Sequence, residues 1–273
     1  MVSVAYPEKP WLASYEEGVP EHIAYEDICL PHILDRTAEQ FPEKTALIFE
    51  GCRITFRQLR NMANSLAACL TAFGIKKGDA VAVLLPNLIP CVAAYYGILK
   101  AGGIVVMNNP LYTDPELERQ FNDSGAKVLI TLDLLANRMI DLRPRTAIKK
   151  IIVCSIGDYL PFPKNLLFPL VAKRRKLAAR VKEAPDVYRW KDCIERHEPV
   201  PPTAAIGLDD VAIYQYTGGT TGVTKGVELT HRNLSCQAQQ CMAWFPKFRK
   251  GEEIMLAALP YFCLLYTSPS PRD

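Results

Sequence analysis

Continuous apolar runs alternate with amphipathic stretches along the middle of the chain. Ala80–Leu85 and Ile104–Met107 are entirely apolar, which is typical of strands buried on both faces. Lys127–Thr131 and Lys150–Cys154 have a similar character after their first lysine. Because helical patterns separate these runs, the sequence predicts an α/β fold in which helices cover both faces of a parallel sheet.

Two of the helices are predicted to begin with a capping box, in which a hydroxyl residue and a glutamine or glutamate three residues later bond each other's backbone N–H groups. The pairs are Thr55 with Gln58, opening a helix over Phe56–Phe73, and Thr113 with Glu116, opening a helix that ends near Gly125. A further helix is expected from Leu88 to Ala101, where two glycines follow and end it.

The strongest candidate for chemistry is the stretch Tyr216–Gly226, which reads YTGGTTGVTKG and holds four glycines and four threonines around one lysine. Such a stretch can turn its N–H groups inward around a phosphate, and the lysine adds a full positive charge. The alternative is a surface turn that binds no ligand.

The flanks of this stretch distinguish it from a P-loop, which has a helix directly after its lysine. Here Lys225 is followed by Gly226 and by the strand-like run Val227–Leu229. The preceding run, Val211–Tyr216, is β-branched and aromatic, which also favours a strand. The loop is therefore expected to join strand to strand at the carboxyl edge of the sheet, where α/β proteins bind their ligands.

The loop resembles the signature loop of the acyl-adenylate-forming enzymes, the AMP-binding superfamily of acyl-CoA synthetases, luciferases and peptide-synthetase adenylation domains. Thr224 stands where that family usually has proline, and Leu229–Asn233 extends the likeness. The upstream part is similar to the long-chain fatty acid CoA ligases of bacteria. The segments that carry this second likeness are Pro86–Leu88, Tyr96–Gly102, Asn109–Thr113 and Asn122–Ala126.

The resemblance implies a two-step reaction with magnesium as cofactor. A fatty acid first reacts with ATP to give acyl-AMP and pyrophosphate, and the thiol of coenzyme A then displaces AMP to give acyl-CoA. By position in the motif, the residues that would hold the β and γ phosphates are Thr217, Gly218, Gly219, Thr220, Thr221 and Gly222, and Lys225 would neutralise charge. The family's catalytic lysine, magnesium-binding glutamate and ribose-binding aspartate belong to motifs that this sequence does not contain. No catalytic or metal-binding residue is therefore assigned.

Other functions stay open beside fatty acid activation. An aryl or coumarate-type CoA ligase is the alternative within the family, whereas the match at Asn109–Thr113 disfavours a peptide-synthetase adenylation domain. A non-catalytic nucleotide-binding fragment is the alternative from another class. ATP binding without formation of acyl-AMP would identify it.

The resemblance also implies a domain organisation. Residues 1–262 would be a partial N-terminal AMP-binding domain without its C-terminal domain, and such a chain is expected to be inactive alone. The final segment, Cys263–Asp273, departs from the apolar strand pattern of Ile254–Leu259 and reads as the translation of a transposase sequencing adapter. This predicts that the native sequence ends at Tyr261 or Phe262. The alternative is a genuine terminus rich in proline and serine.

The composition limits which binding partners and which cellular compartment are expected for the protein. The net charge of +3, from 32 basic and 29 acidic residues, gives no electrostatic case for nucleic acid binding. The 9 cysteines include no C-x-x-C pair, which is typical of reduced thiols in the cytosol. Because no signal peptide is evident and Pro86 interrupts the longest apolar stretch, Ala80–Leu99, we expect a soluble cytoplasmic protein.

One segment breaks the α/β pattern. Lys164–Lys182 carries seven cations among aliphatic residues and no acid. A basic amphipathic segment favours peripheral contact with an anionic membrane, into which a fatty acid partitions. The alternative is a solvated insertion on the surface.

His231 follows the loop and its flanking strand and suggests a general base. In the family's motif this position belongs to a helix start. We therefore expect His231 to cap or pack locally and assign it no catalytic role.

Overall fold

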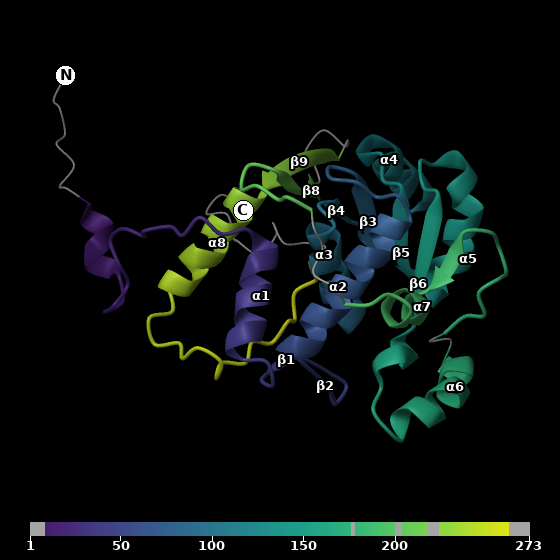
Figure 1. Cartoon of the computed structure of the whole chain (residues 1–273), viewed down its shortest axis with the longest axis horizontal. Coiled ribbons are helices and arrows are strands. Elements are labelled where there is room, and N and C mark those ends of the chain that lie inside the picture. Colours follow the sequence, from purple (N-terminus) through teal and green to yellow (C-terminus); the bar gives the residue numbers. More distant parts are fainter. Residues whose placement is uncertain (1–8, 176–177, 200–203, 218–223, 262–273) are drawn as a thin grey trace.

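The computed structural model describes residues 9–175, 178–199, 204–217 and 224–261. Its main feature is a seven-stranded sheet with the order β7-β6-β5-β3-β4-β8-β9 (Figure 1). All neighbouring pairs are parallel except β8 with β9. The strands are β3 (Ala80–Leu84), β4 (Ile104–Met107), β5 (Val128–Leu132), β6 (Lys150–Cys154), β7 (Val187–Arg189), β8 (Val211–Thr217) and β9 (Lys225–Thr230).

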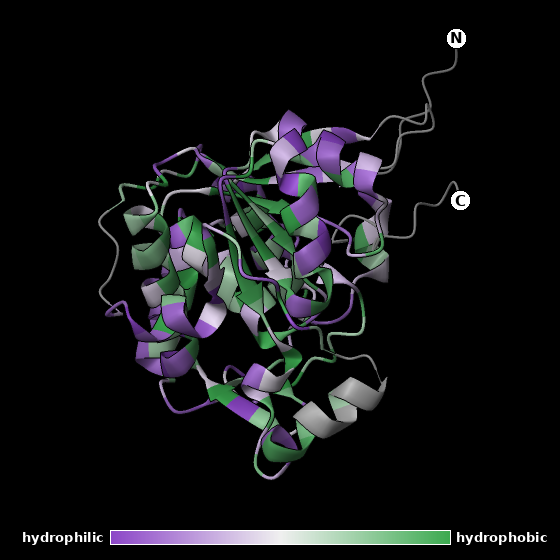
Figure 2. Cartoon of the chain, turned by 90° about the vertical axis from the view of Figure 1, so that its right-hand side faces the viewer, coloured by the Kyte–Doolittle hydropathy of each residue, from purple (hydrophilic) through white to green (hydrophobic). Residues whose placement is uncertain are grey.

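Helices cover the sheet on both faces, as the alternation of apolar runs predicts. One face packs against α1 (Leu30–Gln40), α2 (Phe56–Ala72), α3 (Ile89–Lys100) and α7 (Trp190–Glu195), and the other against α4 (Asp114–Ser124) and α5 (Asp133–Leu142). Successive residues of β3 alternate between these two cores, because side chains of a strand point to opposite faces. Figure 2 shows the resulting apolar strands in the interior. The predicted α/β class is confirmed.

Both predicted capping boxes form. The Thr55 N–H donates to Gln58 Oε1 at 2.9 Å, and the Gln58 N–H donates to Thr55 Oγ1 at 3.2 Å. At α4, the Thr113 N–H donates to the Glu116 carboxylate at 2.7 Å. That helix ends at Gly125, whose φ of 61° lies in the left-handed region that glycine adopts without strain.

Several elements carry weak sequence signals and were not predicted. The helix α1 has Cys29 as its N-cap and no side-chain cap, and α5 follows β5 with no intervening loop. The antiparallel hairpin of β1 (Thr45–Phe49) and β2 (Cys52–Thr55) turns at Glu50 and Gly51, both with positive φ, instead of at the usual Asn-Gly. The remaining elements are α6 (Lys164–Arg175) and the 3₁₀ helices η1 (Pro10–Ser14), η2 (Arg143–Arg145) and η3 (Ile156–Tyr159). The helix α8 (His231–Ala243), in contrast, begins where the family's motif has a helix start.

The apolar strand pattern of Ile254–Leu259 does not produce a strand, so that interpretation was wrong for this structure. The segment is irregular, and Leu256 is 90% exposed. The Asn87 amide donates to the carbonyl oxygens of Ala257 at 3.0 Å and Leu259 at 2.8 Å. Within the described ranges no strand pairs with this segment, and its large apolar side chains are exposed.

We expect Gly97 to be essential for the packing of α3 on α2. A Cβ at this position would lie 2.8 Å from Leu66 Cδ2 and 3.1 Å from the Ala63 carbonyl oxygen. In the protein that carries this chain, Gly97→Ala should therefore lower the free energy of unfolding by about 1–3 kcal/mol. Urea denaturation measures this, with Gly207→Ala as the control, since an added Cβ there meets its nearest atom only at 3.5 Å. Equal midpoints for the two variants would contradict the close approach.

Candidate functional site

The glycine- and threonine-rich loop connects two antiparallel strands. Tyr216 pairs with Gly226 and Thr217 pairs with Lys225, so the ladder continues to the last residues before and after the loop. This arrangement confirms the prediction that the loop joins strand to strand, and it excludes a P-loop, because Lys225 begins β9 and not a helix.

The loop leaves the sheet at its carboxyl edge. The strand β8 runs parallel to β4, with Val105 beside Ile213 and Val106 beside Tyr214, and β4 runs parallel to β3. The end of β8 at Thr217 therefore lies on the same side of the sheet as the ends of β3, β4 and β5. Ligands of open α/β sheets bind at this side.

The structure places two of the seven predicted phosphate-binding residues. Thr217 and Lys225 face each other across the hairpin, and the Thr217 hydroxyl lies 3.5 Å from the Lys225 carbonyl oxygen. Lys225 is exposed and forms no ion pair with any residue that the structure describes. Gly218, Gly219, Thr220, Thr221 and Gly222 lie outside the described residues.

The residue before the loop, Tyr216, is held from a second element. Its hydroxyl donates to Asp123 Oδ2 at 2.6 Å, at the end of α4. Its ring covers Gly226, where an added Cβ would lie 3.3 Å from Tyr216 Cζ. Burial and the hydrogen bond to Asp123 raise the pKa of the Tyr216 phenol, so it stays protonated as a donor. Sequence reasoning missed this contact, although both partners lie in segments that carry the family likeness.

His231 lies at the other end of the hairpin. It is the first residue of α8 and is buried, and its backbone N–H donates to the Asp210 carbonyl oxygen at 3.0 Å. Burial lowers the pKa of its imidazole to about 4, although Asp210 acts in the opposite direction. Val211 pairs with Thr230, so His231 adjoins the amino end of β8, away from the loop. The expectation that His231 packs locally is confirmed.

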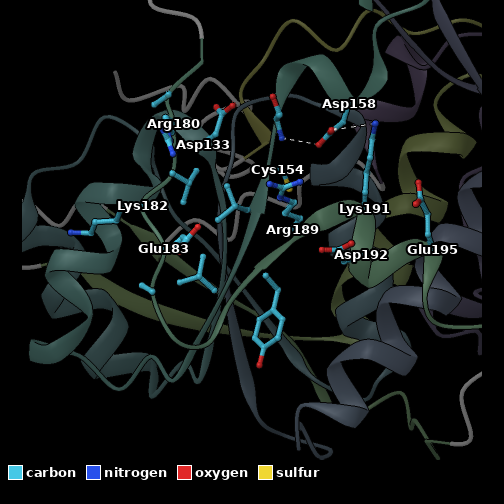
Figure 3. A pocket seen from close by; sticks show the side chains of 17 residues that line it. Asp133, Cys154, Asp158, Arg180, Lys182, Glu183, Arg189, Lys191, Asp192 and Glu195 are labelled. Atoms are coloured by element: carbon cyan, nitrogen blue, oxygen red, sulfur yellow. Dashed lines mark hydrogen bonds and ion pairs between the residues drawn. The ribbon is translucent and has the colours of Figure 1, made fainter. Parts of the chain in front are cut away.

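A cavity of about 1290 Å³ opens at the carboxyl ends of β5, β6 and β7 (Figure 3). Burial raises the pKa of the Asp133 carboxyl, and Asp158 accepts a hydrogen bond from the Ser155 N–H at 2.9 Å. Lys191 Nζ lies 3.5 Å from Asp158 Oδ1, and the lining holds charges of both signs. Because β3 and β4 separate this cavity from β8 in the sheet, it is distinct from the signature loop.

Metal and disulfide chemistry have no support within the described ranges. No three histidine, cysteine or carboxylate side chains there lie close enough to hold a metal ion. The cysteines of those ranges are free thiols, and most are buried. Burial raises the pKa of the Cys91 thiol to about 12, which keeps it protonated and unreactive.

An open, mostly parallel sheet with a glycine-rich loop at its carboxyl edge is typical of nucleotide-binding α/β domains. A comparison with protein families identifies which family within this class the chain belongs to. The model of the family described as AMP-binding enzyme matches residues 34–268, and this chain belongs to that family.

Curated relatives show the same relationship. The chain is 42% identical over 257 residues to a long-chain-fatty-acid–CoA ligase of Bacillus subtilis (strain 168). The aligned region covers 93% of this chain and 46% of the relative. The chain thus spans about half the length of the curated relatives that it matches.

Solved structures agree with the fold. A long-chain-fatty-acid-CoA ligase from Archaeoglobus fulgidus superimposes with a TM-score of 0.66 at 27% identity, over 84% of this chain and 42% of that chain. An anthranilate CoA ligase in complex with anthranoyl-AMP gives a TM-score of 0.65 at 25% identity, over 80% of this chain and 37% of that chain.

We expect the buried His231 to make folding sensitive to acid. Its pKa is about 4 in the folded protein, and an unfolded histidine titrates near 6.5, so between these values the unfolded chain binds more protons. The free energy of unfolding should therefore fall as the pH drops from about 6.5 to about 4, by up to about 1.4 kcal/mol per pH unit. His231→Gln should flatten this dependence in urea titrations between pH 7 and 5. The control is His22→Gln, at an exposed side chain, which should leave the slope unchanged; an unchanged slope in His231→Gln would contradict the assignment.

Proposed function

We propose that the protein carrying this chain activates a fatty acid with ATP to form acyl-AMP, and then transfers the acyl group to coenzyme A. The observation that carries the proposal is the position of the signature loop at the carboxyl edge of the sheet, with the exposed Lys225 at its base. The family match and the likeness to a long-chain-fatty-acid–CoA ligase support the choice of reaction.

The chemistry explains why such a loop is needed. A carboxylate resists nucleophilic attack by a thiol because it is anionic and lacks a good leaving group. When its oxygen attacks the α-phosphate of ATP, the bond to the β-phosphate breaks, and negative charge builds on the departing pyrophosphate. Preorganised donors and a cation next to that pyrophosphate lower the barrier. Thr217, Lys225 and the loop residues Gly218, Gly219, Thr220, Thr221 and Gly222 would provide them.

The remaining groups of the reaction would come from other parts of the protein. Magnesium would neutralise phosphate charge when bound, but the described residues include no metal-binding cluster, so none is assigned to it. The chain spans about half of its curated relatives, which leaves room for the residues of the thiol step elsewhere.

The class of acid is the second part of the proposal. The Bacillus subtilis relative favours a long-chain fatty acid, whereas the solved complex with anthranoyl-AMP represents an aryl acid in a more distant protein. Exchange of pyrophosphate into ATP that depends on a long-chain fatty acid, and not on benzoate-type acids, would support the first. ATP binding with no exchange for either class would instead indicate a non-catalytic nucleotide-binding protein.

We also place this reaction in the cytoplasm next to a membrane surface, through the segment Lys164–Lys182. Leu166, in the first turn of this segment, is 66% exposed, and Leu167 is exposed beside it. Phe162, just before the segment, is 77% exposed. The helix α6 lies outside the three layers of the fold (Figure 1). Within the described residues, no helix has the length and apolar content needed to span a bilayer. The contact would therefore be peripheral.

Lys225→Ala should reduce the carboxylate-dependent exchange of pyrophosphate into ATP by about 100-fold, because one electrostatic stabiliser of the departing pyrophosphate is lost. The matched control is Lys149→Ala, at an exposed lysine that directly precedes β6, at the amino edge of the sheet. Lys225→Arg should retain part of the activity, since it keeps the charge. Full exchange activity in Lys225→Ala would rule out the phosphate role.

The double variant Leu166→Ser/Leu167→Ser should weaken binding to anionic phospholipid vesicles by about 100-fold, because burial of each of the two leucines contributes on the order of 1.4 kcal/mol. Co-sedimentation with vesicles measures the binding. Leu111→Ser is the control, since Leu111 is 87% exposed in the connection between β4 and α4. Equal binding by the double variant and the unmodified protein would contradict membrane contact through α6.

A further inference from the structure

The segment Asn122–Ala126 carries part of the family likeness, yet the proposed reaction gives it no role. The structure brings its Asp123 to the base of the signature loop, although 93 residues separate Asp123 from Tyr216 in sequence. The Tyr216 hydroxyl donates to Asp123 Oδ2 at 2.6 Å and lies 3.5 Å from the Gln120 carbonyl oxygen. A short bond from a protonated phenol to a carboxylate is among the stronger hydrogen bonds that proteins form.

The elements around this bond are joined by further buried contacts. Tyr216 is 9% exposed and packs with the core between the sheet and α4. Gln120, one turn before Asp123, is buried and accepts a hydrogen bond from the Asn108 amide at 2.6 Å, directly after β4. The helix α4 is thus tied to the carboxyl ends of both β4 and β8.

The amino end of α4 is fixed as well. Arg138 on α5 donates to Asp114 Oδ1 at 2.5 Å and to the Tyr112 carbonyl oxygen at 2.6 Å. The capping box of Thr113 and Glu116 closes the same turn. The two ends of α4 are therefore fixed by Asn109–Thr113 and Asn122–Ala126. The carboxyl end of α4, through Asp123, in turn anchors Tyr216.

We propose that Asp123 and Tyr216 are positioning residues that fix the base of the signature loop for phosphate binding. The inference rests on the proposed function, because it assumes that this loop holds the phosphates of ATP. Neither residue is assigned a contact with a reacting atom. The phenol–carboxylate bond fixes the end of β8 at Tyr216. Thr217 is the next residue of this strand, and Lys225 is its cross-strand partner, so both are held in a constant position.

The first test needs no nucleotide. Trypsin cleaves after Lys225 only when the β8–β9 ladder opens, so the cleavage rate reports how firmly the hairpin base is held. In the protein that carries this chain, Tyr216→Phe and Asp123→Ala should each raise this rate by about tenfold. Asp123→Asn should fall between them and the unmodified protein, because its amide oxygen still accepts the phenol hydrogen. Tyr214→Phe, two residues away on the same strand, should change nothing.

The second test uses exchange of pyrophosphate into ATP. Tyr216→Phe and Asp123→Ala should each raise the KM for ATP by about tenfold with a smaller change in kcat, since placement of the phosphates and not the reacting groups is altered. The double variant should be no worse than either single variant, because both remove the same bond. Multiplied effects in the double variant would overturn the proposal.

The two tests separate this inference from the proposed function. If the unmodified protein shows no carboxylate-dependent exchange while both variants accelerate cleavage after Lys225, the reaction is wrong and the anchoring of the hairpin stands. If cleavage is the same in all proteins, the positioning role is wrong whatever the exchange assay shows.

Discussion

The pairing of β8 with β4 is the contact on which the placement of the signature loop depends. Only two register pairs join these strands, Val105 with Ile213 and Val106 with Tyr214, and they bring together residues more than 100 positions apart. The cost in chain entropy is met by burial, since Ala212 and Ile213 are almost completely inaccessible to solvent. Because the pair is parallel, β8 ends at the carboxyl edge, and the loop opens there.

The hairpin that carries the loop has two chemically different ends. At the amino end of β8, burial keeps His231 neutral, and Asp210 forms an ion pair with Lys77. At the carboxyl end, Lys225 is exposed, with no ion-pair partner among the described residues. Asp210 and Lys77 already neutralise each other, whereas an exposed cation without such a partner among the described residues can attract an anionic ligand. This contrast explains why the loop and not the histidine is the site of the proposed chemistry.

Much of the fold could be predicted from the sequence, because the buried strands are uniform apolar runs and the capping boxes of α2 and α4 mark where those helices begin. The signature loop could also be recognised from the sequence, because its density of glycine and threonine is unlike that of a buried strand or helix. The helix α1 and the β1–β2 hairpin were missed, as they lack side-chain caps and an Asn-Gly turn. The Asp123–Tyr216 bond had no local signal, because only the parallel sheet brings those residues together. Ile254–Leu259 shows the converse, a strand pattern with no partner strand within the described residues.

The most direct test of the central claim is a crystal structure of the whole protein with ATP. The account predicts that the β and γ phosphates lie at the carboxyl end of β8, with Lys225 Nζ and the Thr217 hydroxyl within hydrogen-bonding distance of their oxygens. Phosphates bound elsewhere, for example in the cavity beside Asp133 at the ends of β5 and β6, would contradict it.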